Sequence, residues 1–567
     1  MGDTLHTSLW PRFFFTGLAS LSFLVLLARL VDVSLIRGGY YQTLAQQNRI
    51  RALPVYAPRG LLFDRTGAAF VENEETKRVA RFEQGKPVEF TDKEEATHET
   101  EVVIPSWKRV YPLGEAVAHI VGYIGQVSKD EVGEKGCLRP GGGVSDPEGQ
   151  GSVYELGDLV GRMGAEKAFD CQLRGKNGEE LVEVDAKGNK VRVLGRREPE
   201  KGQDIILSLD AGLQKAARSA LGEKRGAIVA LSPRTGEVLA LVSSPTFNPD
   251  TISVDYPKLS TDPNIPLFNR ALGGAYPPGS TFKIVTAAAG LEEGKIDERT
   301  TFVDPGVLEV GGQKFANWYF TQYGKTEGEI NLVRAITRST DTFFYKVGEW
   351  VGVDKLSDWA NKFGLGEKTE IGLGGETAGL VPSPSWKERV KGERWFLGNT
   401  YHLSIGQADL TASPLQITRM TAVIANGGKL CKPTIQSLVT SHQSPACNDV
   451  GLSQETINLI SQGMIGACSP GGTAFPLFDF KVKSEHEPAD APPREIQVAC
   501  KTGTAQFGDP QDRTHAWLTA FAPAPSVLSA VEGQPEIVVT ALIEAGGEGS
   551  YVAAPVVKQV LEEWFSR

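Results

Sequence analysis

An apolar segment near the N-terminus limits what this chain can fold into more than any other feature of the sequence. Residues 13–28 carry no charge, and these 16 residues would reach about 24 Å as a helix, short of the roughly 30 Å of a hydrocarbon core. Continuing the helix by another two turns adds Arg29 and Asp32, which lie three residues apart on one face and can partly neutralise each other. We therefore predict one transmembrane helix over residues 12–36.

Charge alone does not settle on which side of the membrane the rest of the chain lies. Positive residues near a span tend to stay in the cytoplasm; Arg12 precedes the segment, and four arginines follow it: Arg37, Arg49, Arg51 and Arg59. Long domains often cross regardless of this bias. A cleaved signal peptide is the alternative, although no small-x-small cleavage site follows the apolar run. On the chemistry developed below, we expect residues 1–11 to form a cytoplasmic tail and the bulk of the chain to lie outside.

Composition argues against two classes of site. The formal net charge of −10 argues against nucleic acid as a partner, because phosphate binding needs a basic surface. The six cysteines show no Cys-x-x-Cys spacing and the few histidines do not cluster with them, so neither a zinc site nor a cofactor is expected. In an exported domain an even count allows disulfides, with Cys431–Cys447 the most plausible pair by proximity.

The segment Tyr-Pro-Pro-Gly-Ser-Thr-Phe-Lys, Tyr276–Lys283, predicts a nucleophile at the start of a helix. Two prolines cannot continue a helix, and Gly279 permits a tight turn into the apolar helix that we expect to end near Gly294. Ser280 and Lys283 lie at i and i+3, so the amine can reach the hydroxyl. With a pKa lowered by burial or a neighbouring cation, it can act as the base. Ser-x-x-Lys alone occurs by chance in a chain of this length, so the prediction needs support from elsewhere.

Two further clusters supply that support. Ser339-Thr340-Asp341 precedes an aromatic run in a predicted loop between helices, and Lys501-Thr502-Gly503-Thr504 lies on an apolar strand. We expect Lys501 to place a second cation near Lys283, which lowers the pKa of an amine and attracts a carboxylate. Because Gly503 has no side chain, a substrate backbone can pair with the strand edge there.

The order of predicted elements indicates an α+β fold whose strands meet across a long helical insertion. Asp210 is a good N-cap for a helix that ends at Leu221. Strands are predicted at 226–231, 237–243, 496–505, 515–522 and 536–544, with a closing helix at about 552–566. These elements predict an antiparallel sheet flanked by helices. His515 precedes a strand and is expected to be structural, whereas the charge-rich residues 72–102 are expected to be exposed.

Together the three clusters resemble those of the serine-acylating penicillin-recognising enzymes: Ser-x-x-Lys, Ser-x-Asn or Asp, and Lys-Thr-Gly. Arg59–Gly67 resembles the Arg-Gly-x-x-x-Asp-Arg-x-Gly motif of class B penicillin-binding proteins. Further segments fit that class: Gly161–Asp170, Leu173–Gly175, Val182–Gly188, Ser404–Gln407, Thr411–Gln416 and Asn426–Gly428. The resemblance implies a transpeptidase domain with a five-stranded antiparallel sheet over residues 201–567, preceded by an elongated pedestal of the dimerisation type over residues 37–200.

Within class B, the chain resembles penicillin-binding protein 2, the elongation transpeptidase that maintains rod shape. The resemblance is carried by Asn48-Arg49-Ile50-Arg51 after the membrane helix and by Asp341, where septal relatives more often have Asn. One departure is that only about 40 residues separate Gly67 from Arg109, so the head subdomain of the pedestal is shorter than is usual in the family. Contacts made by the head are therefore not carried over to this chain.

The resemblance also implies a mechanism. Ser280 attacks the D-Ala-D-Ala amide of a peptidoglycan stem peptide with Lys283 as base, and the acyl group then passes to an amine of a neighbouring stem. Ser339 and Lys501 relay a proton to the leaving amine, and Asp341 hydrogen-bonds the network. Backbone N–H groups of the nucleophile and of the last threonine form an oxyanion hole, worth about 3 kcal/mol per donor. The substrate-binding residues implied are Thr502, Gly503 and Thr504.

The implied partners are stem peptides, the membrane, covalent β-lactam inhibitors and a multi-pass membrane glycan polymerase of the rod-shape machinery. The implied location is the bacterial cytoplasmic (inner) membrane, crossed once, with the catalytic domain in the periplasm. Two alternatives stay open: a septal class B transpeptidase, and a mainly non-catalytic activator of a membrane glycan polymerase. A β-lactamase would need an additional base for deacylation, and none is clear. A bifunctional polymerase would need a glycosyltransferase domain, for which there is too little chain before residue 200.

Overall fold

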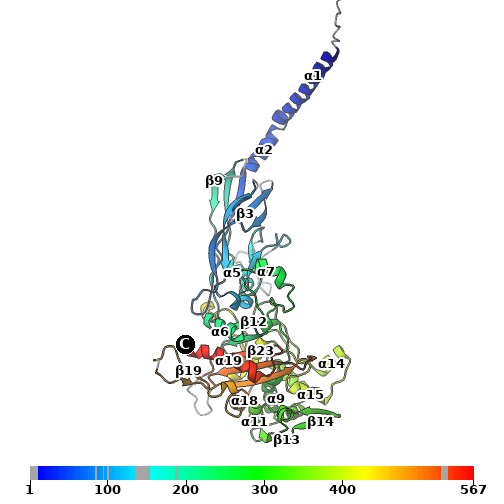
Figure 1. Cartoon of the computed structure of the whole chain (residues 1–567), viewed down its shortest axis with the longest axis vertical. Coiled ribbons are helices and arrows are strands. Elements are labelled where there is room, and N and C mark those ends of the chain that lie inside the picture. The colour runs from blue at the N-terminus through cyan, green and yellow to red at the C-terminus, as the bar shows by residue number, and fades with distance from the viewer. Residues whose placement is uncertain are drawn as a thin grey trace, which may run out of the picture.

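The computed structural model describes residues 10–83, 86–93, 95–98, 101–134, 153–185, 190–488, 490–524 and 534–567. The molecule is elongated, with a long helix at one end, small sheets in the middle and a large mixed body at the other end (Figure 1). Most of the expected cytoplasmic tail, residues 1–9, lies outside the described residues.

The N-terminal helix α1 (Trp10–Val31) continues through one π-helical turn, η1 (Asp32–Ile36), into α2 (Gly38–Arg49). Its apolar part, Phe13–Ile36, has a mean hydropathy of 2.0 and is not covered by the rest of the protein. Among the described residues it is the one helix long and apolar enough to cross a membrane. As expected, Arg29 and Asp32 pair within it, with Nη1 and Oδ2 2.5 Å apart.

Residues 72–102, predicted to be exposed, form most of a small sheet whose described residues are mostly exposed or half-buried, as expected, while Arg78, Val79, Ala80, Phe82 and Phe90 are buried. This sheet has the strand order β4-β3-β5, with β3 at Glu72–Glu83, β4 at Lys86–Thr91 and β5 at Glu101–Val110. The sequence did not predict these strands; the few apolar residues of the segment alternate with charged ones, so that one face packs inward. The neighbouring sheet has the order β1 (Ile50–Val55), β8 (Gly178–Val184) and β9 (Lys190–Arg197). The two sheets share a core made of Leu53, Ala80, Phe82, Phe90, Ile104, Val182 and Val184.

The motif Arg59–Gly67 joins the pedestal to the body. Strand β2 (Leu62–Phe63) pairs in parallel with β10 (Ile205–Ile206). The Asp64 carboxylate accepts hydrogen bonds from the backbone N–H groups of Thr66, Ala68 and Ala211 at 2.7, 2.8 and 3.2 Å. One side chain thus closes a turn and contacts the start of helix α6 (Ala211–Leu221). The motif therefore has a structural explanation.

A buried ion cluster lies beside this junction, and we call it the pedestal cluster: Arg59, Arg109, Glu166 and Asp170. The Glu166 side chain is fully buried and bridges Arg59 Nε at 2.6 Å and Arg109 Nη2 at 2.7 Å. Arg59 also reaches Asp170 through its Nη2 atom at 2.8 Å. Two guanidinium groups thus face two carboxylates, and the charges balance.

The body contains the expected five-stranded antiparallel sheet. Its order is β12 (Val238–Ser244), β11 (Gly226–Leu231), β23 (Ile537–Ile543), β22 (Thr514–Ala522) and β21 (Ala499–Gln506). Alternate residues of the strands face two apolar layers: Trp517 and Phe521 pack against the helical insertion, whereas Leu518 and Ala520 pack beneath α19 (Gly549–Ser566) and α6 (Ala211–Leu221). Both faces are therefore covered, and β21 is left at an edge.

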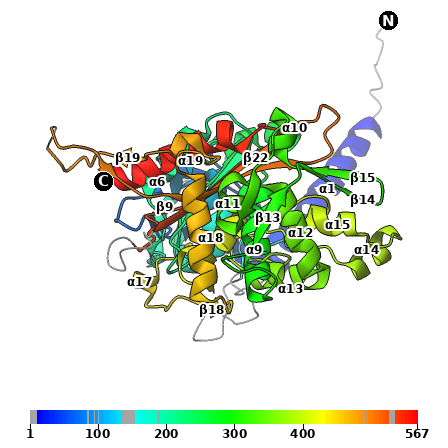
Figure 2. The same cartoon turned by 90° about the horizontal axis from the view of Figure 1, so that it is seen from below.

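Helices of the insertion cover the side of the sheet that faces the candidate site. Figure 2 shows α18 (Gln454–Ala467), α11 (Leu332–Arg338) and α9 (Lys283–Glu292) beside one another. Asp210 caps α6 as expected, accepting the N–H of Leu213 at 2.9 Å.

Two disulfides lie in the body. Cys431–Cys447, the pair expected from proximity, joins the short strands β17 (Lys429–Cys431) and β18 (Cys447–Asp449). Cys468–Cys500, which the sequence did not single out, joins the end of α18 to β21.

Candidate active site

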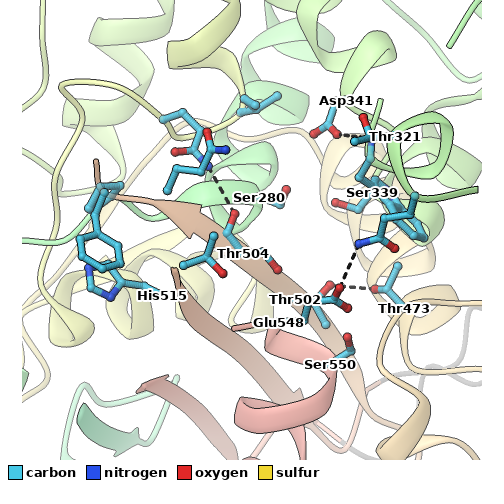
Figure 3. A pocket seen from close by; sticks show the side chains of 18 of the residues that line it. Ser280, Thr321, Ser339, Asp341, Thr473, Thr502, Thr504, His515, Glu548 and Ser550 are labelled. Atoms are coloured by element: carbon cyan, nitrogen blue, oxygen red, sulfur yellow. Dashed lines mark hydrogen bonds between the residues drawn. The ribbon is translucent and has the colours of Figure 1, made fainter. Parts of the chain in front are cut away.

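A cleft of about 1220 Å³ opens along the edge strand β21 and receives candidate residues from three distant parts of the chain (Figure 3). Its lining includes Ser280, Ser339, Asp341, Thr502 and Thr504. The two lysines, Lys283 and Lys501, are fully buried behind this wall.

Ser280 lies in η3 (Gly279–Phe282), a single turn of 3₁₀ helix that leads directly into α9. Gly279 has a φ of 56°, which favours glycine, and its N–H donates to the Gly406 carbonyl at 2.8 Å. The hydroxyl of Ser280 is partly exposed to the cleft and has no hydrogen-bond partner within the part of the chain that the structure describes. The turn therefore presents an unengaged hydroxyl at a helix start.

The Lys283 amine is saturated by acceptors other than Ser280. Its Nζ donates to the Ser339 carbonyl at 2.7 Å, to Ser339 Oγ at 3.1 Å and to Asp341 Oδ1 at 2.6 Å. An ammonium has three protons, so these bonds account for its donors. The direct bond to Ser280 expected from the i, i+3 spacing is not formed here, because the carboxylate and the Ser339 loop compete for the amine.

Ser339 connects the two lysines. It lies between α11 and α12 (Asp341–Val351) with a φ of 55°, a left-handed conformation that is uncommon for a residue with a side chain. Lys501 Nζ donates to Ser339 Oγ at 2.8 Å and to the Thr502 carbonyl at 3.0 Å. A continuous hydrogen-bonded path therefore runs from Lys283 through Ser339 to Lys501.

The surroundings of the two lysines lower both pKa values. Burial lowers the pKa of Lys283, although the Asp341 carboxylate opposes the shift. Burial also lowers the pKa of Lys501, to well below its usual range, and the charge on Lys283 adds to that effect. Burial, one of the two causes expected from the sequence, is thus what lowers the pKa of Lys283, whereas the charge of one lysine on the other acts on Lys501.

A second layer of polar residues, which sequence reasoning missed, holds Asp341. The Trp318 backbone N–H donates to Asp341 Oδ2 at 3.0 Å, and the Asp341 N–H donates to Asn317 Oδ1 at 3.1 Å. Asp304, which is buried, accepts from Asn317 Nδ2 at 2.9 Å and from the Thr342 hydroxyl at 2.6 Å. No local motif marks these residues; their positions depend on the tertiary fold.

The structure gives a packing reason for a glycine at position 503, in addition to the substrate pairing expected from the sequence. A Cβ atom at this position would lie 3.0 Å from the Trp517 Cβ, 3.1 Å from the Pro278 carbonyl oxygen and 3.2 Å from Thr281 Cγ2. These atoms belong to the sheet and to the segment that carries Ser280, not to open space at the strand edge. The glycine therefore lets the nucleophile segment pack closely on β21.

The remaining polar groups of β21 face the cleft. Thr504 is exposed, and its carbonyl accepts from Gln407 Nε2 at 3.3 Å. The Thr502 hydroxyl lies 2.9 Å from the hydroxyl of Thr473, a contact that no motif indicated (Figure 3).

His515 lines the cleft, but its ring is already engaged in contacts within the fold. Its ring stacks on Phe507 with centroids 4.1 Å apart, and Nδ1 accepts the N–H of Ala545 at 3.1 Å. Burial lowers the pKa of His515 to about 4, so the ring is neutral near pH 7. Among the described residues, no group of three or more His, Cys, Asp or Glu could hold a metal ion.

Comparison with known proteins places this cleft in a family. The Penicillin binding protein transpeptidase domain matches residues 226–562, and the Penicillin-binding Protein dimerisation domain matches residues 94–207. The chain belongs to the penicillin-binding protein transpeptidases. The peptidoglycan D,D-transpeptidase MrdA of Acinetobacter baumannii is 31% identical over 97% of this chain and 87% of its own length.

Solved structures of penicillin-binding proteins agree with the predicted subclass. Pseudomonas aeruginosa PBP2 in complex with WCK 5153 is 31% identical, with a TM-score of 0.69 over 91% of this chain and 97% of its own. A chain from a peptidoglycan synthase complex that coordinates polymerization and crosslinking is 27% identical, with a TM-score of 0.71 over 98% of this chain and 99% of its own. The expected resemblance to penicillin-binding protein 2 is confirmed.

Proposed function

We propose that this penicillin-binding protein is the peptidoglycan D,D-transpeptidase of cell elongation, cross-linking stem peptides through a serine acyl-enzyme. The observation that carries the proposal is the pair of buried lysines joined through Ser339, beside an unengaged Ser280 hydroxyl in a cleft of about 1220 Å³. A serine hydroxyl needs a base, and an amine whose pKa is lowered by burial supplies one. Relatives named for this activity match nearly the whole chain.

In the first step, Ser280 Oγ attacks the carbonyl carbon of the penultimate D-Ala, and its proton passes to the neutral amine of Lys283. The C–N bond of the terminal D-Ala then breaks, and the leaving nitrogen takes a proton along the path Lys283–Ser339–Lys501. In the second step, an amine of a neighbouring stem attacks the ester carbonyl and loses its proton to the same path. The bond between the carbonyl carbon and Ser280 Oγ then breaks, and Oγ takes a proton back from Lys283. The products are the cross-linked stems and free D-Ala.

Three other groups complete the assignment. The hydroxyls of Thr502 and Thr504 hold the terminal carboxylate, and the backbone N–H groups of Ser280 and Thr504 stabilise the oxyanion of the tetrahedral intermediate. Asp341 holds the Lys283 amine through the 2.6 Å bond, which keeps the amine aimed at Ser339 between turnovers. Asp341 favours the protonated form of Lys283, whereas Lys501, whose pKa lies well below its usual range, is the stronger acid when protonated and so the better donor to the leaving nitrogen.

We further propose how the whole chain is arranged. Residues 12–36 anchor it in the bacterial cytoplasmic membrane, residues 37–200 form the pedestal with a shortened head, and residues 201–567 form the transpeptidase domain in the periplasm. The elongated shape supports this arrangement, because the body that contains the cleft lies at the opposite end of the molecule from helix α1 (Figure 1). A membrane glycan polymerase of the elongation machinery is the proposed partner, supported by the similarity to a chain from a peptidoglycan synthase complex.

A labelled penicillin tests the reaction class. The proposal predicts a long-lived covalent adduct on the purified chain, which Ser280→Ala lacks, whereas rapid hydrolysis of the penicillin would indicate a β-lactamase. In a cell depleted of the protein, Ser280→Ala should fail to restore cross-linking and rod shape. Full rescue by that variant would instead support a non-catalytic activator of the polymerase.

A further inference from the structure

One loop contacts both sides of the catalytic cluster and has no part in the mechanism so far. We call residues Cys468–Ala474 the brace loop; it follows α18. Its Gly471 carbonyl accepts from Arg338 Nη1 at 3.1 Å, next to Ser339, and its Thr473 hydroxyl lies 2.9 Å from that of Thr502. The loop therefore spans from the Ser339 turn to the strand that carries Lys501.

The brace loop is fastened at its first residue by a covalent bond to the strand. Cys468 forms a disulfide with Cys500, the residue immediately before Lys501 on β21. Cys500 is fully buried and Cys468 is 5% exposed, so the bond lies inside the body. The brace loop is thus tied to the strand at two points, covalently at Cys468 and through the hydroxyl of Thr473.

The loop itself is tightly closed. The N–H groups of Thr473 and Ala474 both donate to the Ala467 carbonyl, at 3.1 and 2.9 Å. A Cβ on Gly472 would lie 2.3 Å from the Gly466 carbonyl oxygen, which leaves no room for a side chain. The Thr473 hydroxyl consequently has a position fixed by the end of α18.

We propose that Thr473 is a positioning residue for substrate binding, and that the Cys468–Cys500 disulfide holds it in place. The proposal rests on the proposed function, in which Thr502 binds the terminal carboxylate. A hydroxyl has one proton to donate; when Thr473 donates to Thr502 Oγ1, the Thr502 proton is left for the carboxylate. Thr473 thus acts through Thr502 on carboxylates, whether of a stem peptide or of a β-lactam.

The strand position matters for a second reason. The Thr502 carbonyl accepts from Lys501 Nζ at 3.0 Å, so a shift of β21 at this residue also moves the amine that contacts Ser339. Loss of the disulfide therefore acts on binding and on the lysine path together, whereas loss of the Thr473 hydroxyl acts on binding alone.

Thr473→Val and Thr473→Ser test the first part, because both nearly preserve the shape of the residue and only the second keeps the hydroxyl. Acylation by benzylpenicillin is followed in the full-length protein, and its rate is separated into the dissociation constant of the initial complex and the rate of the chemical step. We expect Val to weaken initial binding about three- to tenfold with little change in the chemical step, and Ser to restore it. Unchanged binding in Thr473→Val, an equal loss in both variants, or a loss confined to the chemical step would overturn the assignment.

The second disulfide supplies a matched control for the brace. Cys431→Ala/Cys447→Ala removes a bond between two strands outside the cleft and should leave acylation unchanged, whereas Cys468→Ala/Cys500→Ala should lower it by at least threefold. Adding Thr473→Val to the second double variant should cost less than it does in wild type, since both changes act on Thr502. Equal effects of the two double variants would contradict the proposal that the Cys468–Cys500 disulfide positions Thr473. Full additivity of Thr473→Val with Cys468→Ala/Cys500→Ala would contradict it too. If wild type itself forms no adduct, it is the proposed function that fails.

Discussion

Two buried clusters of charged residues in this protein differ in their balance of positive and negative groups. The pedestal cluster sets Arg59 and Arg109 against Glu166 and Asp170, with contacts of 2.6–2.8 Å. The cleft cluster sets Lys283 and Lys501 against the single carboxylate of Asp341, with a serine hydroxyl shared between the amines. The first is neutral overall, and the second carries an excess positive charge when both lysines are protonated.

The balance of charge in each cluster decides whether the pKa values of its residues are raised or lowered. Burial alone would lower the pKa of Arg59, but Glu166 and Asp170 outweigh it and raise that pKa above its usual value. Burial would likewise raise the pKa of Glu166, yet the two arginines hold it below its usual range. In the cleft burial prevails, and the pKa values of both lysines are lowered.

The contrast separates a structural ion cluster from a chemical one. Arginine does not lose its proton in proteins, so the pedestal cluster has one charge state and serves to fix the junction. Lysine gives up its proton when buried, so the cleft cluster can exchange protons with a substrate. Four predictions test this difference, in order of decreasing expected effect.

Lys283→Met should reduce acylation of Ser280 by benzylpenicillin about 10²- to 10⁴-fold, because the base is lost. Stopped-flow or gel measurements of the labelled adduct, taken per folded molecule, check this. Lys346→Met is the matched control, since Lys346 forms an ion pair with Glu349 on the same protein without entering the lysine path. A variant that acylates at the wild-type rate would remove Lys283 from the mechanism.

Glu166→Gln should lower the free energy of unfolding by about 3–5 kcal/mol, since it leaves two arginines buried with one carboxylate. Urea unfolding of the detergent-solubilised protein measures this, and acylation per folded molecule should stay close to wild type. Glu198→Gln is the control: its pair with Arg196 is at the surface, and its removal should leave the free energy of unfolding close to that of wild type. Equal costs at the two sites would mean that burial does not distinguish them.

Acylation should speed up as pH rises, by up to about tenfold per pH unit, until the lysine that must be neutral has lost its proton. The lowered lysine pKa values place this rise below the usual lysine range. The free energy of unfolding should also rise with pH, up to about pH 10.4. Below that pH the unfolded chain binds more protons at these two lysines than the folded chain does. A rate that is flat or falls with rising pH would argue against a lysine base.

His515→Asn should change acylation by less than about twofold and leave its pH profile unaltered above about pH 5, because His515, with a pKa of about 4, is already neutral there. Asparagine keeps an acceptor for the Ala545 N–H. Loss of a titration step from the profile in this variant would assign His515 a chemical role and weaken the contrast between lysine and structural groups.

Patterns that are local in the sequence were predicted well. The alternation and turn signals found the five strands, the N-cap Asp210 located α6, and the apolar run located α1. Segments whose structure depends on distant partners were missed: the strands within residues 72–102 need Leu53 and Val182 to bury their apolar face. The same holds at the site, where Asn317, Asp304 and Thr473 meet their partners only through the tertiary fold.

Mapping the β-lactam adduct tests the central claim most directly. After exposure of the intact protein to benzylpenicillin, mass spectrometry should find one added molecule of the intact drug, because the ring opens without loss of atoms, on the peptide that contains Ser280. The adduct should be absent from Ser280→Ala. An adduct on a different residue, or none on the wild-type protein, would contradict the account of a nucleophile served by two buried lysines.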